Sequence, residues 1–249
     1  GVLLEFEGAR CAEFLAALET EKPPLARIES IELSPVAAQD AAEFVILDSA
    51  GGAGRARIIA DVATCDDCLS DLFAPVSSFH LYPFVTCTQC GPRFTIAAAL
   101  PYDRARTAMA GFSMCAACAR DYADPRDRRF HAEAIACPDC GPRLDHDMGE
   151  IVEKIAAGAI VALKGIGGYQ LICDARNDAA VAALRRRKDR DAKPFAVMAA
   201  DAAAVEAFAA PTPRERSLLE SPQRPIVLID SKQRLAPSVA PGLARIGVM

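Results

Sequence analysis

Cysteine is the residue type in this chain whose spacing most clearly indicates chemistry. Eight of the ten cysteines form four Cys-x-x-Cys pairs, and 18, 24 and 18 residues separate successive pairs. The pairs are Cys65 with Cys68, Cys87 with Cys90, Cys115 with Cys118, and Cys137 with Cys140. Two thiolates separated by two residues can bind one Zn²⁺ from a single turn, and two such pairs complete a tetrahedral site. The sequence therefore predicts two structural zinc ions.

The cysteine pairs belong to an internal repeat. A shift of 50 positions places the first four of these cysteines on the last four, and Gly91-Pro92-Arg93 on Gly141-Pro142-Arg143. This Gly-Pro sequence predicts a metal-binding knuckle, because glycine permits a positive φ and proline prevents the turn from continuing as a helix. The repeat suggests that the two pairs within each half combine, but by spacing alone the first pair could equally combine with the last.

Two histidines lie close enough to the cysteines to compete for the metal. Under the same shift, His80 aligns with Phe130 and His131 aligns with Leu81. A ligand of the repeated unit should recur in both halves, so we expect sites made of four cysteines each.

A disulfide-bonded secreted scaffold is the alternative reading of the cysteines. The chain shows no apolar signal segment at its start and no apolar run long enough to span a membrane. Cys-x-x-Cys is also a poor structural disulfide and a common metal-ligand pair in reducing compartments. We therefore expect zinc and a cytoplasmic location. Cys11 and Cys173 lie singly among apolar residues, where buried, inert thiols are expected.

The elements that must position these residues form three segments of an α+β multidomain protein. In residues 1–48 the pattern predicts strands at 2–7, 28–33 and 44–47 and a helix that begins near Cys11. Together these elements would form part of a ferredoxin-like unit. Residues 49–57 predict a glycine-rich linker and 58–146 the duplicated zinc region. Residues 147–249 predict a partial α/β domain. We expect helices at 151–158 and 214–220, and two further helices that begin after N-caps at Asn177 and Asp201. The expected strands cover 159–163, 171–173, 194–198 and 225–229.

Two groups of residues in the α/β segment could bind an anion. Lys164 and the glycines that follow it predict either a phosphate cradle or a tight strand–strand turn. Lys188, Arg190 and Lys193 precede a buried strand and could converge on one polyphosphate. Their alternative is a solvated helix end that complements the macrodipole, which is our expectation for Arg185, Arg186 and Arg187. The net charge of −5 gives no general reason to expect a nucleic-acid partner.

Three features of the zinc region belong together. They are the cysteine pattern, the sequence Cys87-Thr-Gln-Cys-Gly-Pro-Arg-Phe-Thr-Ile96 and the sequence Arg128-Arg-Phe-His131. Together they resemble the zinc region of the HypF family. These proteins are carbamoyltransferases of nickel–iron hydrogenase maturation. Residues 164–174 and 184–198 resemble the family's YrdC/Sua5-like domain, and the first 48 residues resemble the second half of its acylphosphatase-like domain. The resemblance covers essentially the whole chain.

The resemblance implies an activity, its substrates and a partner. Carbamoyl phosphate is hydrolysed, the carbamate is joined to ATP (with Mg²⁺) as carbamoyl adenylate, and the carbamoyl group passes to the C-terminal cysteine of HypE. There it becomes the cyanide ligand of the hydrogenase iron. Lys188, Arg190 and Lys193 are then nucleotide or carbamate ligands, Tyr169 matches an entry-loop tyrosine, and Lys164 belongs to the same loop.

The resemblance also implies that the chain is a fragment with no complete catalytic site. The acylphosphatase arginine and asparagine would precede Gly1, and a Kae1-like domain would follow Met249. Two alternatives remain: a Sua5/YrdC-type enzyme that makes threonylcarbamoyl adenylate for tRNA modification, and a non-catalytic zinc interaction module. Double-stranded RNA binding is sometimes inferred for the YrdC fold from its basic groove, and the small basic patch and acidic chain give it little weight here.

Overall fold

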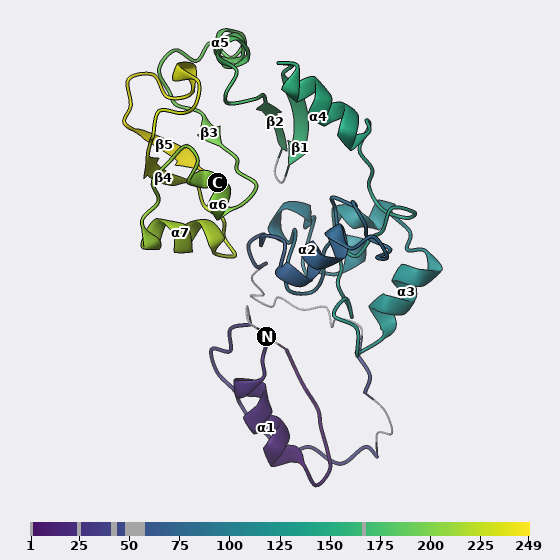
Figure 1. The fold of residues 1–249 in the computed structure, drawn as a ribbon. Helices are drawn as coiled ribbons and strands as arrows, with labels where there is room; N and C mark the ends of the chain where they lie inside the picture. Colours follow the sequence, from purple (N-terminus) through teal and green to yellow (C-terminus); the bar gives the residue numbers. More distant parts are fainter. Residues whose placement is uncertain (1, 24–25, 41–43, 48–57, 166–167) are drawn as a thin grey trace.

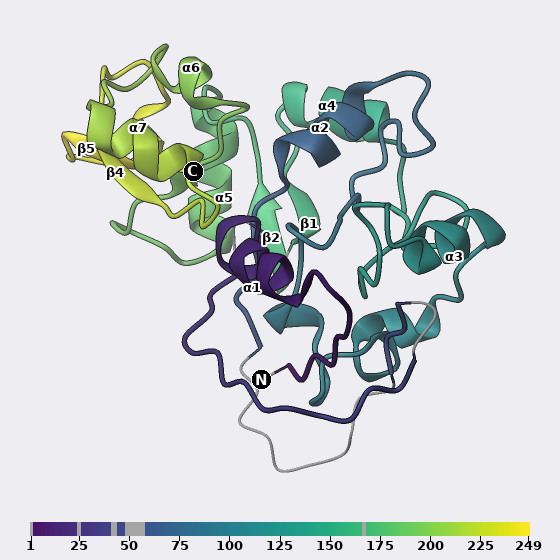
Figure 2. The ribbon, with the colours of Figure 1, turned by 90° about the horizontal axis from the view of Figure 1, so that it is seen from below.

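The computed structural model describes residues 2–23, 26–40, 44–47, 58–165 and 168–249. Figure 1 shows three parts in chain order, with the zinc region between the segment around α1 and the α/β part that contains α4 to α7. Figure 2 views the molecule from below, with α1 in front. The predicted linker at 49–57 lies outside the described residues. Every helix that the structure describes is too short or too polar to span a lipid bilayer.

The N-terminal segment forms the predicted helix. Helix α1 covers Cys11–Thr20, and the ring of its Phe14 packs against Phe6 with 4.9 Å between centroids. The strands predicted at 2–7, 28–33 and 44–47 are wrong, because no described residue of these segments is paired in a sheet. A sheet is stable only when it buries an apolar face. Here Leu3 and Leu33 remain 86% and 65% exposed, so the ferredoxin-like sheet has no buried face.

The zinc region contains little regular structure. Its helices are α2 (Asp66–Phe73) and α3 (Ala116–Ala123), and its 3-10 turns are η1 (Phe94–Ile96), η2 (Arg104–Arg106) and η3 (Ala108–Gly111). Both halves share one apolar core, in which cysteines pack with Phe79, Tyr82, Val85 and Ile135. The metal ligands are therefore part of the core, as expected for a region whose folding depends on zinc.

The α/β part follows as alternating helices and strands. The helices are α4 (Met148–Ala156), α5 (Asp178–Arg187), α6 (Ala202–Val205) and α7 (Pro213–Glu220), with a 3-10 turn η4 (Pro237–Val239). Strands β1 (Val161–Gly165) and β2 (Gly168–Ile172) form an antiparallel hairpin. Strands β3 (Ala196–Val197), β4 (Val227–Asp230) and β5 (Arg245–Val248) form a second sheet in the order β3-β5-β4.

Helix caps confirm the sequence reading of this part. The side chain of Asn177 accepts a hydrogen bond from the Ala180 N–H, and Asp201 accepts one from the Ala204 N–H. Thr212 and Glu215 add a reciprocal capping box at the start of α7.

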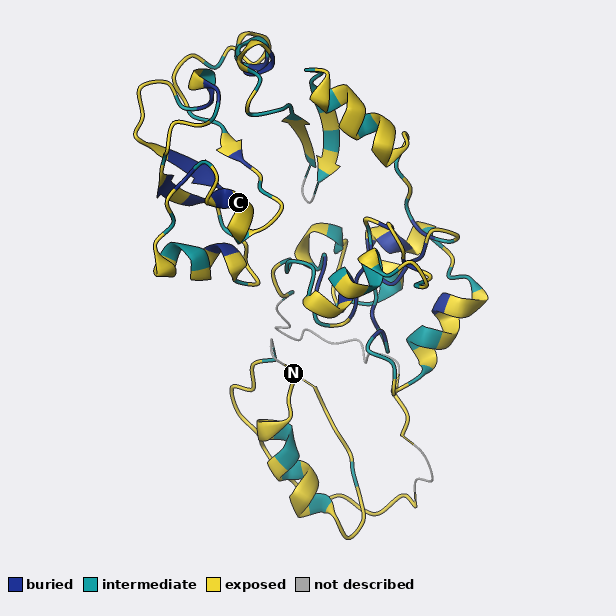
Figure 3. Cartoon of the chain, viewed as in Figure 1, coloured by how far each residue is buried: buried dark blue, intermediate teal, exposed yellow. Residues whose placement is uncertain are grey.

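Strand β5, which lies between β3 and β4 at the centre of the second sheet, was not predicted. It is short, and Gly247 interrupts its apolar pattern. Nevertheless Ile229, Ile246 and Val248 are almost fully buried. Figure 3 shows buried residues gathered on this sheet, whereas the N-terminal segment is largely exposed.

Candidate metal centres and basic cluster

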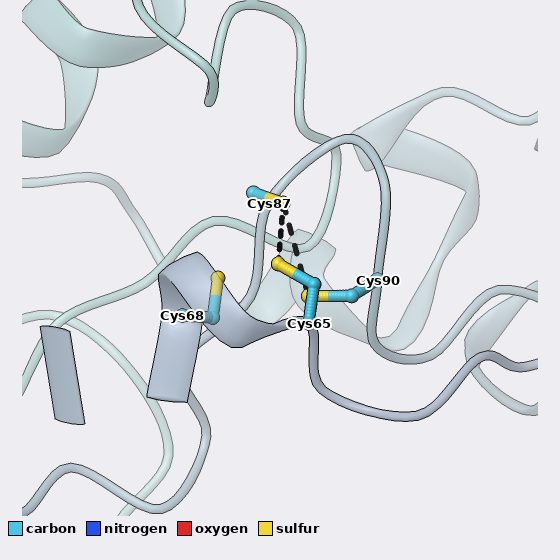
Figure 4. Close-up of side chains that lie close together, drawn as sticks. All are labelled: Cys65, Cys68, Cys87 and Cys90. Atoms are coloured by element: carbon cyan, nitrogen blue, oxygen red, sulfur yellow. Dashed lines mark hydrogen bonds between the residues drawn. The ribbon is translucent and has the colours of Figure 1, made fainter. Parts of the chain in front are cut away.

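The first cysteine cluster combines a helix start with a knuckle loop. Cys65 is the N-cap of α2 and Cys68 lies in its first turn, while Cys87 and Cys90 lie on the loop that follows. The four Sγ atoms all lie within 4.8 Å of one another. Figure 4 shows their side chains directed toward a common centre.

The second cluster repeats this arrangement. Cys115 is the N-cap of α3 and Cys118 lies in its first turn, and Cys137 and Cys140 complete a set of Sγ atoms within 4.8 Å. The pairs within each half therefore combine, and the interleaved arrangement that the spacing had left open is excluded.

The sulfur separations fit zinc. The Sγ atoms of Cys87 lie 3.8 Å from those of Cys65 and Cys90, and Cys140 lies 3.6 Å from Cys118. A tetrahedron with Zn–S bonds of about 2.3 Å has S···S edges of about 3.8 Å. A disulfide would need about 2.05 Å. Both clusters thus have the dimensions of a Zn(Cys)₄ site.

Hydrogen bonds favour the thiolate form at one cysteine of each cluster, whereas in Cys118 and Cys137 burial raises the thiol pKa. Burial opposes the charge on Cys140, but the N–H groups of Cys115 and Cys137 outweigh it and lower the Cys140 pKa to about 7. In the first cluster, hydrogen bonds from the Cys68 and Cys87 thiols and from backbone N–H groups likewise lower the pKa of Cys90.

The glycines of the two knuckles are required for different reasons. Gly91 has a φ of +86°, as predicted, and a Cβ there would lie 2.1 Å from Thr86 Oγ1. Gly141 is not among the positive-φ glycines, so that part of the prediction is wrong for the second knuckle. Its constraint is space, because a Cβ would lie 2.1 Å from Tyr82 Oη and 2.5 Å from Ala136 Cβ.

The arginines that follow both Gly-Pro pairs hold the knuckles closed. Arg93 donates to the carbonyl oxygens of Cys87 and Thr88 at 2.9 and 2.8 Å. Arg143 donates to those of Pro138 and Asp139 at 3.1 and 3.3 Å. The repeat therefore includes the outer support of each site as well as its ligands.

The remaining histidines and cysteines lie outside the clusters. His131 and its counterpart Leu81 both have a positive φ, 50° and 54°, and the ring of His131 packs against Tyr122. Neither His80 nor His131 joins a metal cluster among the described residues, which confirms the four-cysteine sites. Cys11 and Cys173 are only partly buried, contrary to expectation.

Lys164 and Tyr169 face each other across the β1–β2 hairpin. They are paired in the strand register, and the Lys164 Nζ lies 5.3 Å from the centroid of the Tyr169 ring. Tyr169 is 73% exposed. Gly165 pairs with Gly168 at the end of this hairpin, and residues 166 and 167 lie outside the described residues. An anion-binding role for this turn stays a prediction.

Lys188, Arg190 and Lys193 lie on one loop after α5. Lys188 is the C-cap of the helix, and both lysines are exposed. Arg190 donates to the carbonyl oxygens of Lys193 and Pro194 at 2.9 and 2.6 Å and stacks on Phe195. The loop therefore groups three cations, and Arg190 also contributes to its shape.

Comparison with known proteins gives the chain a family. The family model described as "HypF finger" matches residues 64–97 and 114–145, and the Sua5/YciO/YrdC model, described as "Telomere recombination", matches residues 153–249. The carbamoyltransferase HypF of Rhizobium leguminosarum bv. viciae is 54% identical over 250 residues, which cover 100% of this chain and 33% of that protein. The HypF of Rhodobacter capsulatus is 44% identical over 260 residues, covering 100% and 35%. Over its whole length the chain is homologous to HypF.

Solved HypF structures share the fold. A crystal structure of full-length HypF in the phosphate- and nucleotide-bound form superimposes with a TM-score of 0.89 at 42% identity, covering 96% of this chain and 33% of that one. HypF of T. kodakarensis superimposes with a TM-score of 0.84 at 44% identity, covering 96% and 32%. The chain thus spans about a third of the length of these HypF proteins. The predicted mixed α/β class, with a zinc module and a YrdC/Sua5-like domain, is confirmed.

In the region that matches the HypF finger, the two cysteine clusters fit structural zinc sites. All four positions of each tetrahedron come from protein sulfur, so the metal has no open position for a substrate. The zinc ions therefore stabilise the fold of the region and take no direct part in chemistry.

The sequence reading missed the role of Arg185. Its guanidinium donates to the carbonyl oxygens of Ser238 and Val239 at 2.5 and 3.0 Å, and to that of Arg190 at 2.8 Å. It also stacks on Phe195. The expectation of a solvated cation is therefore wrong for Arg185. No local signal could have revealed this, because Ser238 lies 53 positions away in the sequence.

Proposed function

We propose that this chain is a part of a HypF carbamoyltransferase that contains the zinc region and the N-terminal part of the YrdC/Sua5-like domain. The whole protein would use carbamoyl phosphate and ATP to form carbamoyl adenylate, and would carbamoylate the C-terminal cysteine of HypE for the cyanide ligands of nickel–iron hydrogenase. The observation that carries this proposal is the homology along the whole chain, which joins a HypF finger to a YrdC-type domain in one order.

The proposed division of labour follows the segments. Residues 1–48 belong to the acylphosphatase-like domain, 49–57 to a linker, 58–146 to the zinc region and 147–249 to the YrdC/Sua5-like domain. The free thiols of the zinc region favour a reducing compartment, which we take to be the cytoplasm. Small molecules and HypE are the proposed partners, and nucleic acid is not.

The basic loop supplies the proposed chemistry of this part. A carbamate oxygen would attack the α-phosphorus of ATP, and the bond to pyrophosphate would break as pyrophosphate leaves. Cations placed along the polyphosphate stabilise the charge that develops on these oxygens. We assign Lys188, Arg190 and Lys193 to that role. Lys164 and Tyr169 would border the nucleotide from the hairpin.

The experiment is carbamoyl-phosphate-dependent exchange of pyrophosphate into ATP, measured in the full-length protein that contains this chain. We expect Lys188→Ala combined with Lys193→Ala to lower the exchange rate by a factor of at least about 100, since each lost charge-assisted contact costs about 1.5–3 kcal/mol. Arg187→Ala is the matched control, because this exposed cation ends the same helix next to Lys188. It should leave the rate unchanged.

Two outcomes would contradict the proposal. Unchanged exchange in the double variant would remove the loop from the nucleotide site. Exchange that requires threonine and bicarbonate in place of carbamoyl phosphate would instead assign the protein to the tRNA-modifying YrdC enzymes.

A further inference from the structure

The duplication provides an internal comparison between the two zinc sites. The ligands, the helix starts and the knuckle arginines of the first site all have counterparts 50 positions later. Among the described residues, one contact from a basic side chain to a ligand sulfur has none. Arg128 of the second repeat donates from Nη1 to the Sγ of Cys68 in the first site, at 2.9 Å. The counterpart of Arg128 is Ser78, and no basic side chain in the described ranges donates to a sulfur of the second site.

The Arg128 side chain is held in place from several directions. Its Nη2 pairs with the carboxylate of Asp71 and donates to the Asp67 carbonyl oxygen at 3.3 Å, both on α2. Its own carbonyl oxygen accepts from the Thr88 hydroxyl, at 3.0 Å, on the first knuckle. The guanidinium is thus fixed between the helix and the knuckle that carry the four ligands of the first site.

The next residue, Arg129, adds further contacts between the second repeat and the first. It is 5% exposed, shares the Asp71 carboxylate with Arg128, and donates to the Thr86 carbonyl oxygen at 3.2 Å. Its guanidinium lies 3.9 Å from the centroid of the Phe79 ring. The second repeat therefore reaches the first site with two adjacent arginines, and the contact in the opposite direction is neutral, from the Tyr82 hydroxyl to the Pro142 carbonyl oxygen at 3.1 Å.

A zinc ion bound by four thiolates carries a net charge of −2. A guanidinium N–H that points at one sulfur offsets part of this charge, and withdraws electron density that would otherwise make the thiolate reactive toward protons and electrophiles. We propose that Arg128 is an outer-shell donor that makes the two zinc sites unequal: the first site retains its zinc, and the second loses zinc and reacts first.

The test measures zinc release and cysteine reactivity in the zinc-loaded 249-residue chain. An excess of chelator with a metallochromic indicator follows release, and pulsed N-ethylmaleimide labelling with peptide mass spectrometry assigns each phase to a site. We expect two phases of equal amplitude that differ about tenfold in rate, given the usual size of outer-shell effects. The four cysteines of the second site should be labelled in the fast phase.

Variants of Arg128 identify the cause of the difference. Arg128→Gln should accelerate the slow phase about tenfold, so that the two phases merge. Arg128→Lys should give an intermediate rate, because lysine restores the charge and lacks the guanidinium fork. Arg126→Gln is the matched control, since Arg126 lies on the same loop, is 89% exposed and pairs only with Asp124 there.

Either of two results would overturn the proposal. In the unmodified chain, equal labelling rates at all eight cysteines, or faster labelling of the first site, would show that Arg128 protects nothing. A slow phase that persists in Arg128→Gln would show that the protection has another source. Where Arg128→Gln fails to fold, the order of labelling in the unmodified chain still tests whether the first site retains its zinc longer, and Arg128→Lys tests the cause.

Discussion

At the scale of single residues, the two zinc knuckles show how the same amino acid meets different demands in two copies of one motif. Gly91 accommodates a backbone that other residues rarely adopt, and Gly141 makes room for the Tyr82 hydroxyl. That hydroxyl donates to the Pro142 carbonyl oxygen, so the close approach at Gly141 is also a contact between the two repeats. The two repeats thus share a glycine at equivalent positions, but backbone conformation requires it in the first repeat and space requires it in the second.

Gly141→Ala should therefore destabilise the zinc region by about 1–3 kcal/mol, the usual cost of overpacking a well-packed site. Gly141→Ala combined with Tyr82→Phe should recover part of the loss, because the hydroxyl at 2.1 Å is removed while Ala136 Cβ at 2.5 Å remains. Denaturant unfolding of the zinc-loaded chain measures both. Equal stability of Gly141→Ala and the unmodified chain would show that the knuckle relaxes freely.

At the scale of elements, the loop after α5 is shaped by side chains in place of backbone pairing. Arg185 donates to carbonyl oxygens of Arg190, Asp191 and Lys193 at 2.8 to 3.2 Å and, on its other side, to the segment at Ser238 and Val239. It therefore anchors the basic loop to η4, which is distant in the sequence. The three cations of the proposed nucleotide site depend on this anchor for their positions.

Arg185→Gln should loosen this loop without unfolding the sheet behind it. Loss of several charge-assisted hydrogen bonds should lower the protection of the Lys188, Arg190 and Phe195 amides against hydrogen exchange by at least about tenfold. Amides of β4 and β5 should keep their protection. Arg187→Gln, at the exposed end of the same helix, serves as the control, and similar exchange in the two variants would contradict the anchoring role.

At the scale of the whole molecule, the zinc region and the α/β part have separate cores. The apolar core of the zinc region includes Cys68, Cys90 and Ile135, all almost fully buried, and is shared by both repeats. The core of the β3-β5-β4 sheet contains Ile229, Ile246 and Val248 and no metal ligand. The two parts also touch, since the Ala63 N–H donates to the Pro222 carbonyl oxygen at 2.9 Å. Their stabilities should nonetheless respond differently to the metal.

Chelation of zinc should unfold residues 58–146 and leave the sheet of the α/β part protected. Structural zinc contributes on the order of 10 kcal/mol or more to small modules, which exceeds the stability that a core of this size supplies alone. Hydrogen exchange before and after chelation checks this region by region. Loss of protection in β4 and β5 together with the zinc region would mean that the two cores fold as one unit.

The sequence by itself determined what depends on neighbours along the chain. The eight cysteine ligands, the Gly91 turn, and the caps at Asn177 and Asp201 were all predicted, because ligand spacing, backbone conformation and capping are local properties.

Tertiary structure alone decided which surfaces meet. It paired the cysteines within each half, brought Arg128 to Cys68 across 60 positions, and placed β5 at the centre of a sheet. It also left the N-terminal strands unformed: Phe6 packs against Phe14 of α1, but Leu3 and Leu33 remain exposed, so the segment has no buried sheet face. These outcomes depend on contacts between distant segments, whose free energy no local pattern records.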